Sequence, residues 1–234
     1  RYYNSMNVNA SRTTVFGTGW TFTYNTSLEE DDSGNVTLFR SDGAMETYIT
    51  EGGGNFTTPH GEHTKLVNNG SYYTLYYKDG MRFIYNNTGN LTRVCDRNGN
   101  NVTLTYSNGR ISNLQDDSGI YLNFTYNDDG LVSQVIDQLD RTVRYWYDAD
   151  DNLVNVTDPI GQNTSYYYDD EHYLIAEINR VDQVKGFVYD VQDRIEKITF
   201  GLHESQAVTA DYVAGLYTKY EFDYNVGNTT VDDY

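Results

Sequence analysis

The sequence predicts an all-β fold, an antiparallel sheet of β-hairpins that repeat along the chain. A fixed period of about 20 residues is typical of repeat architectures, and six tyrosines recur here at steps of 20 or 21 residues: Tyr85, Tyr106, Tyr126, Tyr147, Tyr168 and Tyr189. Between them apolar and polar residues alternate, which is the period of a β-strand. Glycine, Asn and Asp gather where such strands would turn.

Each repeat is predicted to form two short strands joined by tight turns. A Tyr-Asn or Tyr-Asp pair opens a polar turn, and an apolar residue follows. A second apolar residue comes three or four positions later, as in Leu91 and Val94 or Leu153 and Val156. We expect six such repeats over residues 85–200. No stretch of the sequence carries a sustained helical period.

The segments on either side of the array are expected to continue the same sheet within one domain. Residues 1–84 are predicted to be an N-terminal β region that leads into the array. Residues 201–234 are predicted to hold an irregular segment, Gly201–Gly215, and a C-terminal docking strand within TKYEFDYNVGNTTVDDY, where alternation returns.

The composition favours a single-layer sheet over a thick aliphatic core. Hydrophobic residues make up 38% of the chain, which has 24 Tyr and 9 Phe. A tyrosine ring can cover one face of a sheet while its hydroxyl is hydrated or hydrogen-bonded. We therefore expect tyrosines to supply much of the packing.

The repeat segments YDADDNLVNVTDPIG and YSNGRISNLQDDSG, together with the opening RYYNSMNVNASRTTVFGTGWTFTYNTSL, resemble the YD-repeat family. That family includes the rearrangement-hotspot (Rhs) proteins, the toxin-complex shell proteins and the teneurins. The resemblance covers residues 1 to about 200. It implies a long sheet of hairpins that spirals into an open or partial shell or tube.

Charge and cysteine content exclude several function classes. The net charge of −18 argues against a nucleic-acid groove and favours solubility, cations or basic partners. Cys95 is the single cysteine, so no intramolecular disulfide is expected. No apolar run is long enough for a transmembrane helix. The start at Arg1 within a strand-like segment suggests a mature chain or a fragment.

The sequence contains twelve Asn-x-Ser/Thr sequons, against about four expected by chance from its composition: Asn9, Asn25, Asn35, Asn55, Asn69, Asn86, Asn90, Asn101, Asn123, Asn155, Asn163 and Asn228. One explanation is the ordinary use of Asn in turns and Thr in strands. The other is N-glycosylation of a secreted or cell-surface protein. In Asn123-Phe124-Thr125 the apolar residue has the core phase, so Asn and Thr would share the other face.

Candidate catalytic and metal-binding motifs are weak. The segments His60-Gly61-Glu62-His63, Asp148-Ala149-Asp150-Asp151-Asn152 and Asp31-Asp32-Ser33-Gly34-Asn35 have metal ligands, and calcium stays open for the last two, but all three fit loops or repeat turns better. Asp158-Pro159-Ile160-Gly161 resembles an element near the self-cleaving end of Rhs proteins, yet it aligns with the repeat turn Asp96-Arg97-Asn98-Gly99. We expect no enzymatic activity.

The number of strands bears on function. A wall around a cargo of about 100 residues needs about 29 strands per turn, whereas six repeats supply about 12 strands and the N-terminal region about 6 to 8 more. We therefore expect an extracellular protein that self-assembles head-to-tail through its terminal strands into a filament, tube or sheath. The alternative is a segment of a larger shell that encloses a toxin or mediates adhesion. A third hypothesis, carbohydrate binding through exposed rings, would use Trp20 and Trp146.

Overall fold

The structure, a computed structural model, describes residues 1–5, 8, 14–203, 207–223 and 230–233. The chain forms two compact units. The first unit comprises Arg1–Thr21, Tyr126–Gln134 and Thr142–Tyr234, and the second comprises Phe22–Thr125 and Val135–Arg141. Each unit is built from more than one stretch of the chain. The ranges 1–84, 85–200 and 201–234 follow the repeat pattern of the sequence and stay a prediction.

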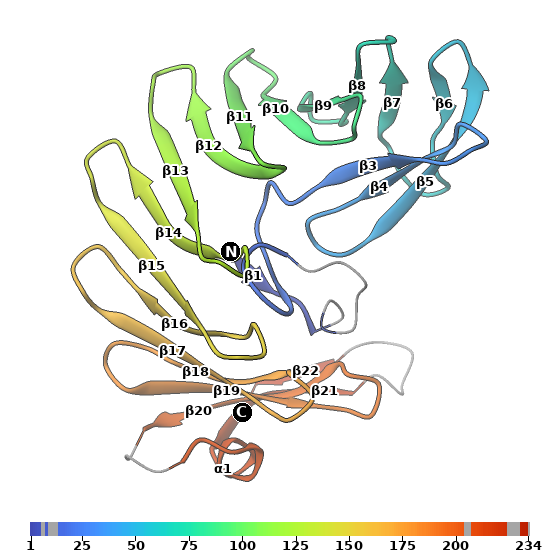
Figure 1. The fold of residues 1–234 in the computed structure, drawn as a ribbon. Helices are drawn as coiled ribbons and strands as arrows, with labels where there is room; N and C mark the ends of the chain where they lie inside the picture. Colours follow the sequence, from blue (N-terminus) through green and yellow to red (C-terminus); the bar gives the residue numbers. More distant parts are fainter. Residues whose placement is uncertain (6–7, 9–13, 204–206, 224–229, 234) are drawn as a thin grey trace. The chain divides into compact units, whose positions relative to one another are not determined.

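Nearly all secondary structure in the described residues is β, which confirms the predicted fold class (Figure 1). Before the array lie β1 (Tyr2–Tyr3), β2 (Trp20–Thr21), β3 (Ser27–Glu30), β4 (Val36–Phe39), β5 (Met45–Gly52), β6 (Asn55–Thr57), β7 (Lys65–Asn68) and β8 (Tyr72–Tyr76). The array itself contains β9 (Arg82–Asn86), β10 (Leu91–Cys95), β11 (Asn101–Ser107), β12 (Arg110–Asp116), β13 (Tyr121–Tyr126), β14 (Val132–Asp137), β15 (Thr142–Tyr147), β16 (Leu153–Thr157), β17 (Asn163–Tyr168), β18 (Leu174–Ile178), β19 (Gln183–Tyr189) and β20 (Ile195–Leu202). After it come α1 (Ala210–Ala214), β21 (Tyr217–Asp223) and β22 (Thr230–Asp233).

Strands that follow one another in the chain pair antiparallel, so the sheet is a run of hairpins. This holds from β3 to β13 and from β15 to β22. In the first unit β22 pairs with β21 through Asp223↔Thr230, and no pairing of its other edge with a strand of this unit is described. The run of hairpins of this unit ends at β22.

One type of five-residue turn closes hairpins at both ends of the strands. At Asp148 the backbone N donates to the Asn152 carbonyl at 3.1 Å, and Oδ1 accepts from the backbone N of Asp150 and of Asn152 at 2.9 Å each. Asp158 makes the same bonds, which agrees with its interpretation as a repeat turn. The fourth residue has a positive φ, 61° at Asp151 and 84° at Gly161, which explains the Gly and Asp at this place.

A β-bulge lies beside the repeated tyrosine in each repeat whose pairing is described. Tyr168 pairs with Leu174 while Tyr167 pairs with Ala176, which leaves Ile175 as the extra residue. The same shift leaves one residue over at the equivalent place of the other repeats: Thr92, Ser112, Val154 and Glu196. A bulge advances the side-chain alternation by one residue. It therefore explains why apolar residues three apart, such as Leu153 and Val156, are both buried.

The two units cover their repeat strands differently. In the first unit, residues 14–21, here called the strap, lie against β15 and β17, as their aromatic contacts show. In the second unit the start of β3 lies against the turn between β9 and β10. Ser27 forms a β-bridge with Asn90, and the Leu28 backbone N donates to the Gly89 carbonyl at 2.9 Å. A Cβ on Gly89 would lie 1.8 Å from the Leu28 carbonyl oxygen, so this contact requires glycine.

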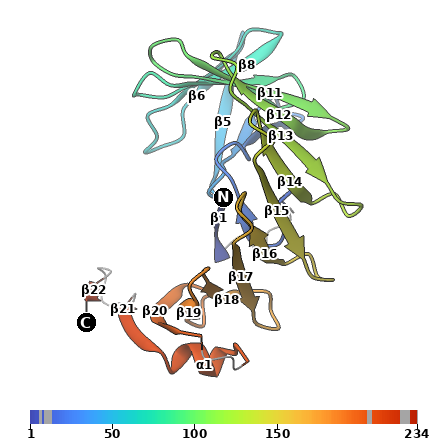
Figure 2. The same ribbon diagram turned by 90° about the vertical axis from the view of Figure 1, so that its left-hand side faces the viewer.

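The segment predicted to be irregular contains a helix, and two strands follow it. Thr209 caps α1 by accepting from the Tyr212 backbone N at 3.2 Å, and the fully buried Val213 packs with Ala176, Ile178 and Val184. Figure 2 shows α1 beside β19. Gly186 allows this approach, because a Cβ there would lie 2.3 Å from a Val213 methyl group. Five residues are too few to produce a helical period in the sequence, so the pattern could not predict α1.

Candidate functional site

The strap is held on the first unit by backbone contacts that need glycine. The Thr18 backbone N donates to the Asp151 carbonyl at 3.2 Å, and the Val132 backbone N donates to the Val15 carbonyl at 2.7 Å. Gly17 has a φ of 90°, and a Cβ on it would lie 2.4 Å from the Asp151 oxygen. The strap therefore touches the turn of one repeat and a strand of another.

Aromatic rings make the contact between the strap and the sheet. The Trp20 ring meets Tyr166 edge-on at a centroid distance of 4.8 Å, and Phe16 meets Tyr145 in the same way at 5.2 Å. Trp20 is 5% exposed and Phe16 is 3% exposed. This burial overturns the hypothesis that Trp20 binds carbohydrate.

Residues at the start of the chain complete this aromatic cluster. The Tyr3 ring packs on Trp20 at 5.6 Å, and its hydroxyl accepts from the Leu174 backbone N at 2.9 Å. The guanidinium of Arg1 lies within 5.8 Å of the Trp20, Tyr145 and Tyr166 ring centres and donates to the Tyr166 hydroxyl at 2.7 Å. Cation–π attraction and one hydrogen bond thus join the terminus to the sheet.

The repeated tyrosines link each repeat to the one before it. In both units their hydroxyls donate to the backbone carbonyl 15 residues earlier: Tyr106 to Leu91 at 2.7 Å, Tyr147 to Val132 at 2.9 Å, Tyr168 to Leu153 at 2.7 Å and Tyr189 to Leu174 at 2.7 Å. Tyr85, the first of the series, is fully buried and shares a hydrogen bond with the Thr26 hydroxyl at 3.2 Å. Burial raises the pKa of Tyr85, Tyr147, Tyr168 and Tyr189 above the ordinary phenol value. These side chains therefore stay neutral donors at physiological pH.

The strap and the tyrosine series meet at Tyr168. Its hydroxyl donates to Leu153 and also accepts from the Trp20 indole Nε1 at 2.7 Å. One phenol thus satisfies a backbone carbonyl and a buried indole N–H. We regard this joint, with the rings around it, as the structural centre of the first unit.

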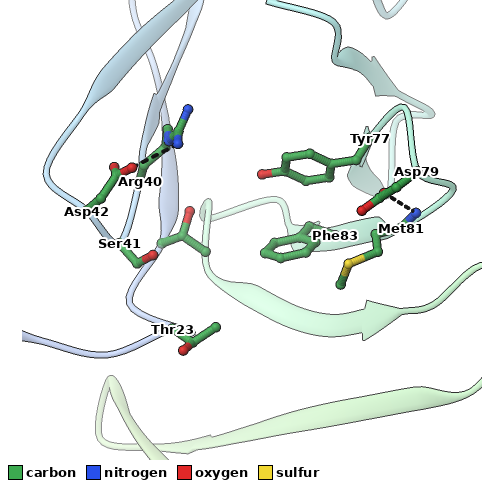
Figure 3. Close-up of a pocket in the computed structure, with 9 residues that line it drawn as sticks. Thr23, Arg40, Ser41, Asp42, Tyr77, Asp79, Met81 and Phe83 are labelled. Atoms are coloured by element: carbon green, nitrogen blue, oxygen red, sulfur yellow. Dashed lines mark hydrogen bonds and ion pairs between the residues drawn. The ribbon is translucent and has the colours of Figure 1, made fainter. Parts of the chain in front are cut away.

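The second unit contains a hollow of about 280 Å³, shown in Figure 3. Tyr77 and Phe83 form one wall with ring centres 5.1 Å apart, and Arg40 lies opposite. Arg40 already pairs with Asp42 at 2.8 Å and with Glu46 at 2.7 Å. Burial raises the pKa of Tyr77 to about 12. An anion would have to displace a carboxylate from Arg40, so the hollow is a poor anion site.

Family models identify the repeats. Residues 147–185, which run from the last residue of β15 into β19, match the RHS repeat. The chain therefore contains a segment similar to the RHS repeat. Residues 1–48, which include the strap, match a domain of unknown function (DUF6531). No curated protein matches the sequence.

Several solved structures resemble the RHS-repeat chain at low identity. A Photorhabdus luminescens Tc holotoxin pore with mutant TccC3 shares 13% identity and a TM-score of 0.45 over 86% of this chain and 12% of that chain. The crystal structure of TcdB2-TccC3-TEV shares 13% identity and a TM-score of 0.40, over 89% and 11% of the two chains. For TcdB2-TccC3-Cdc42 the values are 12%, 0.41, 88% and 16%. The RHS-repeat chain spans less than a fifth of the length of these chains, and similarity at this level assigns it no activity or partner.

The twelve sequon asparagines of the RHS-repeat chain differ in their surroundings. Asn9 and Asn228 lie outside the described residues. Four have exposed side chains: Asn55, Asn69, Asn123 and Asn163. The other six are half-buried: Asn25, Asn35, Asn86, Asn90, Asn101 and Asn155. Within Asn123-Phe124-Thr125 the Asn and Thr are exposed and Phe124 is buried, as the strand phase predicted.

The remaining candidate residues lie in turns and loops. His60 to His63 fall between β6 and β7, and Asp31 and Asp148 each accept backbone N–H groups within their own turns. Within the described part of the chain, no three His, Cys, Asp or Glu side chains come together as a metal site. The described residues also include no helix with the length and hydropathy of a membrane span. Cys95 is buried as a free thiol.

Sequence reasoning recognised the repeated tyrosines but not the strap. Its rings, Phe16 and Trp20, have no periodic counterpart, so no pattern marks what they contact. The two tight glycines, Gly17 and Gly19, both with positive φ, are the one local signal of a sharp backbone path.

Proposed function

We propose that this chain is a structural segment of an extracellular YD-repeat wall and that it has no catalytic role. The series of tyrosine hydroxyl bonds carries the proposal, because each bond joins one repeat to its neighbour. In repeat proteins such nearest-neighbour contacts add up along the array. Stability that grows with the number of repeats suits a wall.

The wall is extended at β22. This strand has a described partner on one side, and an unpaired strand edge is a template for another strand. Of the described strands, the 20 from β3 to β22 belong to the run of hairpins, fewer than the roughly 29 that a closed turn around a small cargo requires. We propose that copies of the chain add head-to-tail at this edge and build a filament, tube or sheath, since contacts that do not close give open assemblies.

The second candidate is a segment of a larger shell that encloses a cargo or mediates adhesion. The match of residues 147–185 to the RHS repeat favours it. In this case the strand beside β22 belongs to the same, longer polypeptide, so isolated copies have no need of one another.

Sedimentation velocity and electron microscopy of the purified chain, with an Asp223→Pro variant, test the head-to-tail proposal. Proline removes a backbone donor and is poorly tolerated in strands, so the variant disrupts the pairing of β21 with β22. We expect elongated assemblies that the variant loses. A dispersed monomer at high concentration would overturn head-to-tail assembly and favour the second candidate, a segment of a larger shell. The same experiment on a chain with further repeats then tests that candidate.

Secretion and N-glycosylation are part of the proposal, and two sequons make a matched pair. Asn69 is exposed, and its Oδ1 accepts from Ser71 and Tyr72 backbone N at 2.9 and 3.0 Å. Asn101 donates both hydrogens of its Nδ2, to the Gly99 carbonyl at 3.0 Å and to Asp117 Oδ2 at 2.9 Å. A glycan replaces one of these hydrogens, so it would break a bond at Asn101 and none of those at Asn69.

Peptide mass spectrometry of the native secreted protein, before and after deglycosylation, measures the occupancy. We expect sugar on Asn69 and little on Asn101. Absence of sugar from Asn55, Asn69, Asn123 and Asn163 together would contradict glycosylation and return the sequons to their role in turn and strand composition. This result would leave the structural proposal standing, because the tyrosine bonds do not depend on glycans.

A further inference from the structure

One face of the first unit, formed by β15, β16 and β17, carries two complete sequons beside an exposed indole. The three strands pair in that order, as Figure 1 shows. Trp146 of β15 pairs with Asn155 of β16, which pairs on its other side with Ser165 of β17. Thr157 pairs with Asn163 on the same face, because side chains two residues apart on a strand share a face. We call these five side chains the sequon face.

The strap packs on the opposite face of these strands. Tyr145 and Tyr166, which have the other strand phase, meet rings of the strap. Trp146 therefore points away from the strap, and its side chain is 55% exposed. A single exposed apolar residue is ordinary, so a role for this ring depends on what lies beside it.

The Trp146 side chain lies next to both functional residues of one sequon, Asn155-Val156-Thr157. Trp146 is the cross-strand neighbour of Asn155, and such pairs have their Cβ atoms about 5 Å apart. The indole Nε1 donates to the Thr157 hydroxyl at 3.4 Å, which keeps the ring beside the sequon. A sugar linked to the Asn155 amide would therefore begin within reach of the indole.

The Asn155 amide can take a glycan without losing a described hydrogen bond. Its Nδ2 donates one hydrogen, to the Ser165 hydroxyl at 3.2 Å. The second hydrogen has no partner among the described residues, so a glycan can replace it. Asn101 differs, because both of its Nδ2 hydrogens are donated. The half-burial of Asn155 thus comes from neighbours that leave one position of the amide open.

The chemistry around the Trp146 ring suits a sugar. A sugar ring presents C–H groups on one face, and the electron-rich face of an indole attracts them. Hydroxyl groups at the edge of the sugar need hydrogen-bond partners. The Thr157 and Ser165 hydroxyls lie on the same face, and the exposed Arg144 pairs with Thr157 beside Trp146. The ring therefore has an apolar surface with polar groups around it.

We propose that the Trp146 indole is the docking platform for an N-glycan on Asn155, with the first sugar ring stacked on the indole. This inference rests on the N-glycosylation proposed above and names the side chain that holds one of the glycans. The strand register selects the chain's own glycan as the source of the sugar, because it fixes Asn155 opposite the ring. The stacked sugar would cover the indole and hold the glycan along the face that the strap leaves free.

NMR spectroscopy of the full chain, secreted with high-mannose glycans and trimmed by endoglycosidase H to one N-acetylglucosamine per site, tests the contact. Protons over an indole ring shift upfield. We therefore expect upfield-shifted sugar protons on Asn155 that return to ordinary positions in Trp146→Ala. Asn163→Gln is the matched control, because it removes the sugar nearest in register, opposite Thr157, and should leave the shift in place. Asn155→Gln should abolish the shift.

The contact should also couple the stability of the first unit to the sugar. In the chain with sugar on Asn155, Trp146→Ala removes the stacking, whereas in Asn155→Gln no stacking remains to be lost. We expect Trp146→Ala to raise the unfolding equilibrium constant about fivefold more in the first background than in the second. An equal change in both backgrounds would show that Trp146 is only an exposed strand residue and would overturn the proposal.

Peptide mass spectrometry of the same material separates the failure of this inference from that of glycosylation. Sugar on Asn69 but none on Asn155 would overturn the inference and leave glycosylation standing, whereas absence of sugar from every sequon would overturn both. Sugar on Asn155 with unshifted protons would also overturn the inference. If free N-acetylglucosamine then shifted the Trp146 indole resonance in Asn155→Gln, the ring would be a site for external carbohydrate.

Discussion

The two compact units of this RHS-repeat chain use the same repeat and complete their cores by different means. Both contain the tyrosine that donates to a carbonyl 15 residues earlier, at Tyr106 in the second unit and at Tyr147, Tyr168 and Tyr189 in the first. The first unit covers its strands with the strap and with α1. The second curls β3 back to the turn before β10.

This difference shows that a repeat specifies hairpins and the links between them but not what covers their apolar face. A single sheet with one bare apolar face is unstable in water, so each unit needs a second layer or a closed path. Segments outside the repeat supply it: the strap in one unit and the residue 22–57 hairpins in the other. Variants that remove the cover should therefore affect one unit at a time.

The largest effect is expected from Trp20→Ala. This residue is 5% exposed, packs on Tyr3 and Tyr166, and donates to Tyr168. Its loss should cost the first unit about 3–5 kcal/mol. Trp146→Ala is the matched control, because Trp146 is 55% exposed and should cost under about 1 kcal/mol. Denaturant unfolding followed by circular dichroism and hydrogen exchange measures both, and equal costs would show that the strap is not a structural cover.

The next effect belongs to the second unit. Gly89→Ala places a Cβ 1.8 Å from the Leu28 carbonyl at a φ of 79° and should cost about 3 kcal/mol. Gly99→Ala is the control, since it has a φ of 93° with open space around it and should cost about 1–2 kcal/mol. Hydrogen exchange resolves the two units. If Gly89→Ala and Gly99→Ala lost the same free energy of unfolding, the contact of Gly89 with Leu28 would not stabilise the second unit.

A smaller effect separates two tyrosines of the series. Tyr189→Phe removes one hydrogen bond and should cost about 1 kcal/mol. Tyr168→Phe also leaves the Trp20 indole N–H without its acceptor, so it should cost about 2 kcal/mol. Urea unfolding of the two variants gives the difference. A Tyr168→Phe cost no greater than that of Tyr189→Phe would contradict the joint between strap and repeats.

The smallest difference between units is expected from alkaline pH, because burial raises the pKa of tyrosines in both. The pKa of Tyr77 in the second unit rises to about 12, and those of Tyr147 and Tyr168 in the first rise as well. A raised folded-state pKa contributes stability that is complete below the unfolded value of about 10 and is lost as pH rises through the folded value. The tyrosinate absorbance and the circular dichroism signal of the folded chain should therefore change together only as pH rises through the raised folded-state pKa values, in both units. Ionisation of these tyrosines in the folded state near pH 10 would show that burial does not hold their hydroxyls neutral.

The sequence predicts the hairpins, their period and the turns because each depends on residues close together. Asp158 and Gly161 show this, since a side-chain acceptor and a positive φ define their turn locally. The three-residue spacing of Leu153 and Val156 is itself a sign of the bulge, because residues three apart lie on opposite faces of a regular strand. The alternation of apolar and polar residues alone does not predict it. Nothing local shows that Trp20 meets Tyr168, 148 residues away, or that Gly186 makes room for Val213.

Segments outside the repeat cover each unit separately, and hydrogen exchange of a chain lacking residues 1–21 tests this most directly. We predict that amides in β15 to β18 lose protection, since Trp20 and Phe16 are gone, while amides in β4 to β11 keep theirs. Unchanged protection in β15 to β18 would contradict the account and would mean that the repeats of the first unit are stable without the strap.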